Sequence, residues 1–136
     1  MKSIVILISG RGSNMESLLK AVADGALPVR VAAVISNRPD AKGLEAAAAQ
    51  DVETCVVDHT RFDTRETFDA AMIKTIDSYS PDLVVLAGFM RILTDAFVRR
   101  YEGRLLNIHP SLLPSFPGLH THRRALEEGV RVHGCT

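Results

Sequence analysis

The feature of this sequence that most constrains its fold is a regular alternation of short apolar runs with longer segments of helical pattern. Five runs are rich in leucine or β-branched residues, lack strict polar alternation, and are bounded by Gly, Pro, Asn or Asp. This pattern is typical of strands that are buried on both faces, as in parallel sheets. The runs cover residues 3–9, 29–36, 53–58, 82–88 and 104–109.

The segments between these runs carry the signals of helices. The first is predicted to begin at an N-cap residue, Asn14, and to end at Gly25. Another opens with a capping-box pattern formed by Asp63 and Glu66. The predicted helical segments are residues 14–25, 43–50, 63–79, 94–103 and 122–129.

A succession of strands and helices with short connections predicts an α/β fold, namely a parallel, Rossmann-like sheet with helices on both faces. The 136 residues correspond to one domain and suffice to bury a continuous core. In such sheets, ligands bind at the carboxyl ends of the strands. The residues that follow each strand are therefore the candidates for a functional site.

Charge and composition narrow the class of protein. Sixteen basic residues balance sixteen acidic ones, so the charge indicates neither a nucleic-acid partner nor an acidic membrane surface. The apolar stretch at the N-terminus is short for a signal peptide and far too short to span a membrane. Cys55 and Cys135 lie far apart and are interpreted as reduced thiols. We expect a cytoplasmic protein.

The first strand runs directly into the loop SGRGSNM, which has the character of a phosphate-binding loop. Gly10 and Gly12 allow close backbone approach, and Ser13 and Asn14 lead into a helix whose N–H groups and positive dipole end suit an anion. The alternative is a glycine turn that joins strand to helix without any ligand. The loop alone does not decide between these two interpretations.

A dinucleotide is a poor candidate for this loop. The dinucleotide fingerprint requires a third glycine where Met15 stands, and an acidic residue at the end of the second strand, where Asn37 stands. A single phosphate, such as that of a sugar monophosphate, fits the loop better.

The last predicted strand ends in a second polar cluster. Asn107 and His109 are two positions apart, so they share one face of the strand, and Pro110 then stops the ladder. An Asn amide can donate to a developing oxyanion, and a His can transfer a proton near neutral pH. This pair suits acyl transfer through a tetrahedral intermediate, although a histidine in this position can also be a hydrogen-bonded structural residue.

The same segment also contains residues that could form a metal site. His120 and His122 follow His109 within thirteen residues, and three histidines can bind zinc. No Cys, Asp or Glu stands with them at a ligand spacing. No metal is expected.

Four stretches together resemble the phosphoribosylglycinamide formyltransferases, the folate-dependent enzymes of purine synthesis. The stretches are ISGRGSNM, SNRPDAKGLE, LAGFMRIL and LLNIHPSLLPSFPGLHTHRRALEEG, and the resemblance runs along nearly all of the chain. Methionyl-tRNA formyltransferases share the Asn-x-His strand but have a different first loop. Formyltetrahydrofolate hydrolases typically carry a second His where Pro110 stands here. Both departures favour the purine enzymes.

The resemblance implies roles for particular residues. The ribonucleotide phosphate would bind to Gly12, Ser13 and Asn14. Asn107 would hold the formyl oxygen, and His109 would act as general acid and oxyanion partner. The formyl-folate would contact Met90, Arg91, Ile92, Leu93 and, through its anionic tail, Arg65. On pattern alone, residues 90–93 would be interpreted as core and Arg65 as a solvated charge.

The implied function is transfer of a formyl group from 10-formyltetrahydrofolate, as co-substrate, to the amine of glycinamide ribonucleotide. Two alternatives stay open, a formyltetrahydrofolate hydrolase and a non-catalytic fragment that binds a nucleotide monophosphate. The family continues past this chain with further strands and an aspartate that pairs with the histidine. Residues 1–136 are therefore expected to form one N-terminal mononucleotide-binding domain with little activity by itself. Whether two copies form a homodimer is left open.

Overall fold

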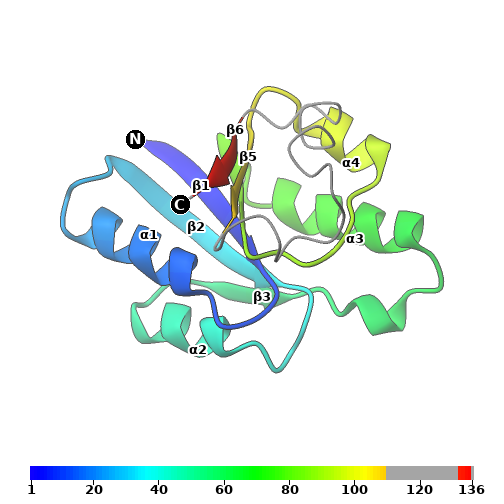
Figure 1. Cartoon of the computed structure of the whole chain (residues 1–136), viewed down its shortest axis with the longest axis horizontal. Helices are drawn as coiled ribbons and strands as arrows, with labels where there is room; N and C mark the ends of the chain where they lie inside the picture. Colours follow the sequence, from blue (N-terminus) through cyan, green and yellow to red (C-terminus); the bar gives the residue numbers. More distant parts are fainter. Residues whose placement is uncertain (110–131, 136) are drawn as a thin grey trace.

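The computed structural model describes residues 1–109 and 132–135, which form a sheet flanked by helices (Figure 1). All five predicted strands are present, and β6 is added at the end of the chain. The elements in order are β1 (Lys2–Ile8), α1 (Ser13–Ala23), β2 (Val29–Ser36), α2 (Lys42–Ala49), β3 (Thr54–Val56), the 3₁₀ turn η1 (His59–Arg61), α3 (Arg65–Asp77), β4 (Leu83–Ala87), α4 (Asp95–Arg100), β5 (Leu105–His109) and β6 (Val132–Cys135). The predicted helix over residues 122–129 lies outside the described residues.

The six strands are ordered β3-β2-β1-β4-β5-β6, and every pair of neighbours is parallel. This is the strand order of the Rossmann fold, so the predicted fold class is confirmed. The chain runs outward from β1 to β3 and then returns to the opposite side of β1 with β4. A change of direction of this kind opens a crevice at the carboxyl ends of the two central strands, where ligands bind in such folds.

The central strand β1 divides the core into two layers. Val5 and Leu7 belong to an apolar cluster with side chains of α3 and α4. Ile6 and Ile8 point the other way, into a cluster with side chains of α1 and α2. Figure 1 accordingly shows α1 and α2 on one side of the sheet and α3 and α4 on the other. Because both faces are covered, β1 shows the continuous apolar run that predicted a buried parallel strand.

The start of α1 differs from the prediction. Asn14 was expected to be the N-cap, but the helix begins at Ser13 and its N-cap is Gly12. Gly12 has a φ of 73°, in the left-handed region that glycine adopts at little cost. The helix therefore begins two residues earlier than an N-cap at Asn14 would place it, and Asn14 falls inside the first turn of the helix.

The start of α3 differs from the prediction as well, in this case by one residue. The capping box was predicted for Asp63 and Glu66, whereas it is formed by Thr64 and Thr67. Thr64 Oγ1 accepts from Thr67 N at 3.1 Å, and Thr67 Oγ1 accepts from Thr64 N at 3.3 Å. Both polar pairs have the spacing of a capping box, and the helix is capped by the later pair.

Within the described residues, no helix is both long enough and apolar enough to cross a membrane.

Candidate functional site

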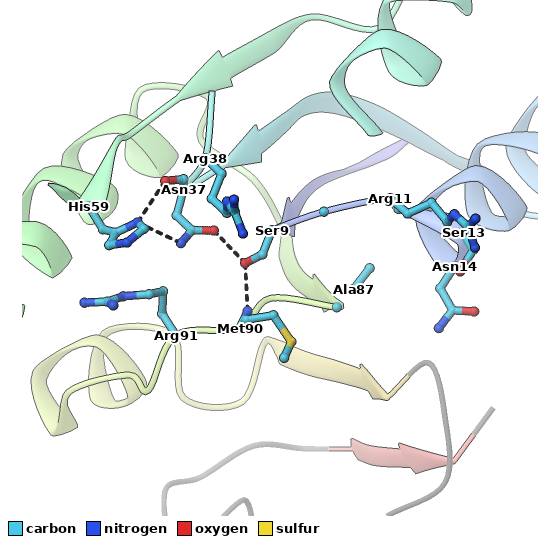
Figure 2. Close-up of a pocket in the computed structure, with 13 residues that line it drawn as sticks. Ser9, Arg11, Ser13, Asn14, Asn37, Arg38, His59, Ala87, Met90 and Arg91 are labelled. Carbon is cyan, nitrogen blue, oxygen red and sulfur yellow. Dashed lines mark hydrogen bonds between the residues drawn. The ribbon is translucent and has the colours of Figure 1, made fainter. Parts of the chain in front are cut away.

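A pocket of about 440 Å³ lies at the carboxyl ends of the first four strands (Figure 2). Residues 9–14, which follow β1, form one wall, and Ala87, Gly88, Met90 and Arg91, at and after the end of β4, form another. Asn37 and Arg38 follow β2, and His59 follows β3. The pocket therefore spans β1 and β4, the two strands between which the direction of the sheet order changes, as expected for a ligand site in this fold.

The loop after β1 is shaped by close backbone contacts. Gly43 N, at the start of α2, donates to Gly10 O at 3.0 Å and ties the loop to that helix. A Cβ on Gly12 would lie 2.8 Å from Met15 Cε and 3.2 Å from the Gly43 Cα. Glycine at position 12 is therefore favoured chiefly by the backbone angle and also by the close approach of the Gly43 backbone, since the tip of the Met15 side chain can move.

The start of α1 provides unpaired donors at this loop. The first N–H groups of a helix have no partner within the helix. Asn14 adds a side-chain donor, because its buried Nδ2 has no hydrogen-bond partner among the described residues. Gly12, Ser13 and Asn14 all line the pocket, so the structure brings together the three residues that were predicted to bind a phosphate.

The charged side chains along the described part of the pocket are all basic. Arg11, Arg38 and Arg91 line it, together with His59, and the described lining contains no Asp or Glu. Arg38 is also paired with Asp40, at 3.3 Å from Nε to Oδ1, on the exposed rim. The resulting field favours an anionic ligand.

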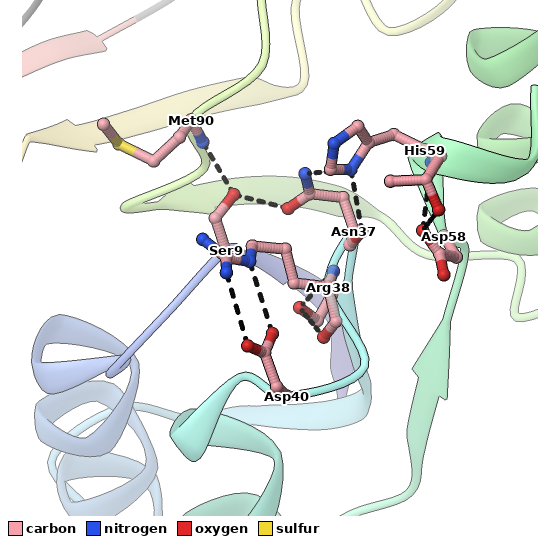
Figure 3. Close-up of polar contacts among 9 residues, drawn as sticks. Ser9, Asn37, Arg38, Asp40, Asp58, His59 and Met90 are labelled. Carbon is pink, nitrogen blue, oxygen red and sulfur yellow. Dashed lines mark hydrogen bonds and ion pairs between the residues drawn. The ribbon is translucent and has the colours of Figure 1, made fainter.

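The floor of the pocket is a hydrogen-bonded chain of side chains from three strand ends (Figure 3). The hydroxyl of Ser9 donates to Asn37 Oδ1 at 2.5 Å and accepts from Met90 N at 2.8 Å. His59 Nδ1 lies 3.1 Å from both Asn37 Nδ2 and the Asn37 carbonyl oxygen. One histidine tautomer accepts from the amide, and the other donates to the carbonyl. The chain joins the ends of β1 and β2 to the segments that follow β3 and β4.

The predicted folate-contacting residues 90–93 divide into two groups. Met90 and Arg91 line the pocket. Met90 is 66% exposed and Ile92 is 50% exposed, which makes them two of the few large apolar side chains at the surface of the described chain. Leu93 is only 9% exposed and packs in the core beside α3 and α4. Leu93 thus has the core position that the pattern alone indicated.

The remaining predicted residues are not part of the described lining of the pocket. Asn107 is a half-buried residue of β5, in register with Leu86 of β4 and His133 of β6. His109 is the last residue of β5, in register with Cys135. Arg65 is the exposed first residue of α3. Their predicted roles in catalysis and folate binding stay predictions.

The structure does not test whether the three histidines considered for a metal come together. His120 and His122 lie outside the described residues. Among residues 1–109 and 132–135, no three His, Cys, Asp or Glu side chains are grouped so that they could hold a metal ion.

Comparison with known proteins decides the family. A sequence profile of the family described as "Formyl transferase" matches residues 2–136. The chain belongs to the formyl transferase family. The resemblance inferred from the sequence motifs is thereby confirmed.

Several formyl transferases are similar over nearly the whole chain. Phosphoribosylglycinamide formyltransferase of Escherichia coli is 54% identical over 98% of this chain, which covers 63% of that protein. The trifunctional purine biosynthetic protein adenosine-3 of Drosophila melanogaster is 45% identical over 99% of this chain and 10% of its own length. The structure of phosphoribosylglycinamide formyltransferase from Coxiella burnetii matches with a TM-score of 0.79 and 50% identity, over 95% of this chain and 61% of that one. The chain therefore spans less than two thirds of these relatives.

Sequence reasoning missed part of the pocket of this formyl transferase. Ser9, Arg38 and His59 were not singled out, and Asn37 was noticed only because it replaces an acidic residue. Ser9 is the last residue of a predicted strand, and the other three follow the carboxyl end of one within two residues. Applying the strand-end rule to every polar residue in such positions would have found them.

Proposed function

We propose that the whole protein is a cytoplasmic formyltransferase in de novo purine biosynthesis, in which residues 1–136 form the mononucleotide-binding domain. It would transfer the formyl group of 10-formyltetrahydrofolate to the amine of glycinamide ribonucleotide. The observation that carries this proposal is the 54% identity to the E. coli phosphoribosylglycinamide formyltransferase along almost the whole chain. The basic pocket at the carboxyl ends of β1 and β4 supports it independently, because both substrates carry negative charge.

The phosphate of the ribonucleotide would bind at the start of α1. Gly12 exposes its backbone there, Ser13 offers a hydroxyl, and the buried Nδ2 of Asn14 has no other partner among the described residues. Backbone N–H groups and the positive end of the helix dipole favour one phosphate in this position. Arg11 on the same loop adds a positive charge.

The formyl-folate would bind along residues 90–93. Met90 and Ile92 present exposed apolar side chains, which suit the flat rings of a folate. Arg91 lines the pocket and Arg65 lies exposed at the start of α3, so both offer a guanidinium to the carboxylates of the folate tail. Ligand pockets commonly combine apolar walls with a few charged groups that fix orientation.

The chemistry would take place beside the end of β5. The amine nitrogen of the ribonucleotide forms a bond to the formyl carbon, and the bond from that carbon to the folate nitrogen breaks. Negative charge builds on the formyl oxygen during this exchange, and Asn107 would donate a hydrogen bond to it. His109 would carry a proton between the entering amine, which loses one, and the leaving nitrogen, which gains one.

Measuring formyl transfer with and without glycinamide ribonucleotide tests this function. The assay uses the chain together with the additional segment that its longer relatives contain. We expect formylated product to form only in the presence of the amine. Release of formate at the same rate without the amine would assign the protein to the hydrolases instead.

The Asn107→Ala variant tests the assignment of the reacting centre in the same assay. Loss of one oxyanion donor typically lowers the rate by about 10²–10³-fold. We expect that decrease in kcat, with little change in the KM of the ribonucleotide, whose phosphate binds elsewhere. Exposed Ser17→Ala on α1, whose hydroxyl donates only to Ser13 O, is the control. An unchanged kcat in Asn107→Ala would contradict the assigned role.

A further inference from the structure

The segment from Met90 to Thr94 is fastened at both ends by buried polar side chains. Met90 N donates to Ser9 Oγ at 2.8 Å, and Thr94 N donates to Asp69 Oδ2 at 2.8 Å. Ser9 is 4% exposed and Asp69 is 2% exposed. The two acceptors come from distant parts of the chain, one from the end of β1 and the other from the middle of α3.

The acceptor at the Met90 end has its orientation set by a neighbour. The Ser9 hydroxyl has one proton, which it donates to Asn37 Oδ1 at 2.5 Å. Its lone pairs are then left to accept from Met90 N, as Figure 3 shows. Asn37 therefore fixes the direction in which Ser9 can accept a hydrogen bond.

The other end of the segment is held through α3. Asp69 is the neighbour of Phe68, and the guanidinium of Arg91 lies over the Phe68 ring, 5.5 Å from its centroid. Thr94 is in turn the N-cap of α4, where its Oγ1 accepts from Phe97 N at 3.2 Å. Asp69 thus determines where the segment ends and where α4 begins.

These contacts leave the middle of the segment available to a ligand. Leu93 is buried, whereas Met90 and Ile92 point outward, and Arg91 lines the pocket. A segment that is ordered before binding loses less conformational entropy when its ligand arrives. Burying a carboxylate is costly unless it is hydrogen-bonded. The hydrogen bond from Thr94 N offsets part of this cost for the buried Asp69.

We propose that Ser9 and Asp69 are positioning residues that hold the backbone from Met90 to Thr94 in the conformation that accepts formyl-folate. The inference rests on the proposed function, because it names the ligand from it. Asp69 is not among the residues that line the pocket, whereas Ser9 lines it with a hydroxyl that is already hydrogen-bonded to Asn37 and Met90. Each acts through one backbone N–H of the segment.

Residue-resolved amide hydrogen exchange tests the positioning without any ligand. We expect Asp69→Ala to accelerate exchange at Thr94, and Ser9→Ala to accelerate it at Met90, each by about tenfold, which corresponds to one hydrogen bond of about 1.4 kcal/mol. Asp69→Asn keeps an oxygen acceptor and should stay close to the unchanged protein at Thr94. Unchanged exchange at both amides in both alanine variants would overturn the proposal.

Titration with two probes, on the protein extended as in the transfer assay, then separates positioning from a general loss of structure. We expect Asp69→Ala to weaken binding of 10-formyltetrahydrofolate about tenfold while binding of ribose 5-phosphate changes by less than about twofold. Asp69→Asn should restore the folate affinity. Equal weakening of both probes would make Asp69 a merely structural residue and overturn the proposal. If the unchanged protein binds no folate, the proposed function fails, and the exchange rates alone decide whether Ser9 and Asp69 order the segment.

Discussion

At the scale of single residues, Gly12 has the most demanding environment in the pocket. Its φ of 73° is costly for any residue with a Cβ, and an added Cβ would meet Met15 Cε at 2.8 Å. Gly10, two residues earlier, has no atom within 4 Å of an added Cβ. The two glycines of the loop are therefore not equivalent, although the sequence shows them as a pair.

This difference predicts effects of different size for the two alanine substitutions. Gly12→Ala should lower the free energy of unfolding by roughly 1–2 kcal/mol and weaken ribose 5-phosphate binding, because the turn must move away from the start of α1. Gly10→Ala should change the free energy of unfolding much less. Urea denaturation and calorimetric titration of both variants provide the measurement. Equal effects at the two positions would mean that the space around Gly12 does not control the loop.

At the scale of elements, the start of α3 shows how closely a helix boundary can be predicted from its pattern. Asp63 with Glu66 and Thr64 with Thr67 both have the three-residue spacing of a capping box. The pattern therefore predicts that a helix begins here, but it does not determine which of two adjacent residues is the N-cap. The backbone at Thr64 is extended, with φ of −131° and ψ of 160°, and Thr64 is the residue that caps.

Alanine substitutions at these two positions test the boundary. Thr64→Ala removes the cap and should cost about 1 kcal/mol of stability. Asp63→Ala is the matched control and should cost much less, since Asp63 caps nothing in the observed helix. Both are exposed, so urea denaturation compares them without a change in the core. A larger loss in Asp63→Ala would place the start of the helix where the sequence first indicated it.

The contact between α3 and the end of α4 is a second feature at this scale. Tyr101 is fully buried, and its hydroxyl donates to Asp77 Oδ1 at 2.8 Å. Arg100 Nη2 reaches the other oxygen of the same carboxylate at 2.9 Å. Burial, and next the hydrogen bond to Asp77, raise the pKa of the Tyr101 phenol well above its usual value.

The raised pKa predicts a loss of stability in alkaline solution. Because the phenol ionises more readily in the unfolded chain, with a pKa of about 10, its contribution is complete below that pH and is lost as the pH rises above it. Tyr101→Phe should cost about 1 kcal/mol at pH 7 and then show a shallower decline above pH 10. A hydrogen bond with Glu53 chiefly raises the pKa of Tyr79 to about 12. Tyr79 is present in both the unchanged protein and the Tyr101→Phe variant, so it does not account for a difference between them. An equally steep loss of stability above pH 10 in the unchanged protein and in Tyr101→Phe would show that folding does not raise the pKa of Tyr101.

At the scale of the whole molecule, the sheet was predictable and the pocket only partly so. Strands such as β1 are buried on both faces and reveal themselves by composition, because few polar residues can occupy such positions. The glycine loop after β1 was predictable as part of the pocket, because its glycines and its place after β1 are local signals. The chain from Ser9 through Asn37 to His59 was not, since it joins residues separated by 28 and 22 positions. Its residues become neighbours only through the strand order.

The strand order also places the two proposed ligand-binding segments side by side. The loop after β1 and the segment after β4 are distant in sequence but adjacent in space, because β1 pairs directly with β4. One wall offers N–H groups and the Asn14 amide, and the other offers exposed Met90 next to Arg91. A phosphate-bearing amine and a formyl-folate would therefore meet across the two central strands.

Mapping amide chemical shifts during separate titrations tests this arrangement most directly. The account predicts that ribose 5-phosphate shifts the amide signals of Gly12, Ser13 and Asn14. It predicts that 10-formyltetrahydrofolate shifts those of Arg91, Ile92 and Leu93, and that each ligand still shifts its own set when the other is bound. Competition of both ligands for the same set of amides, or shifts confined to residues outside the pocket, would contradict the account.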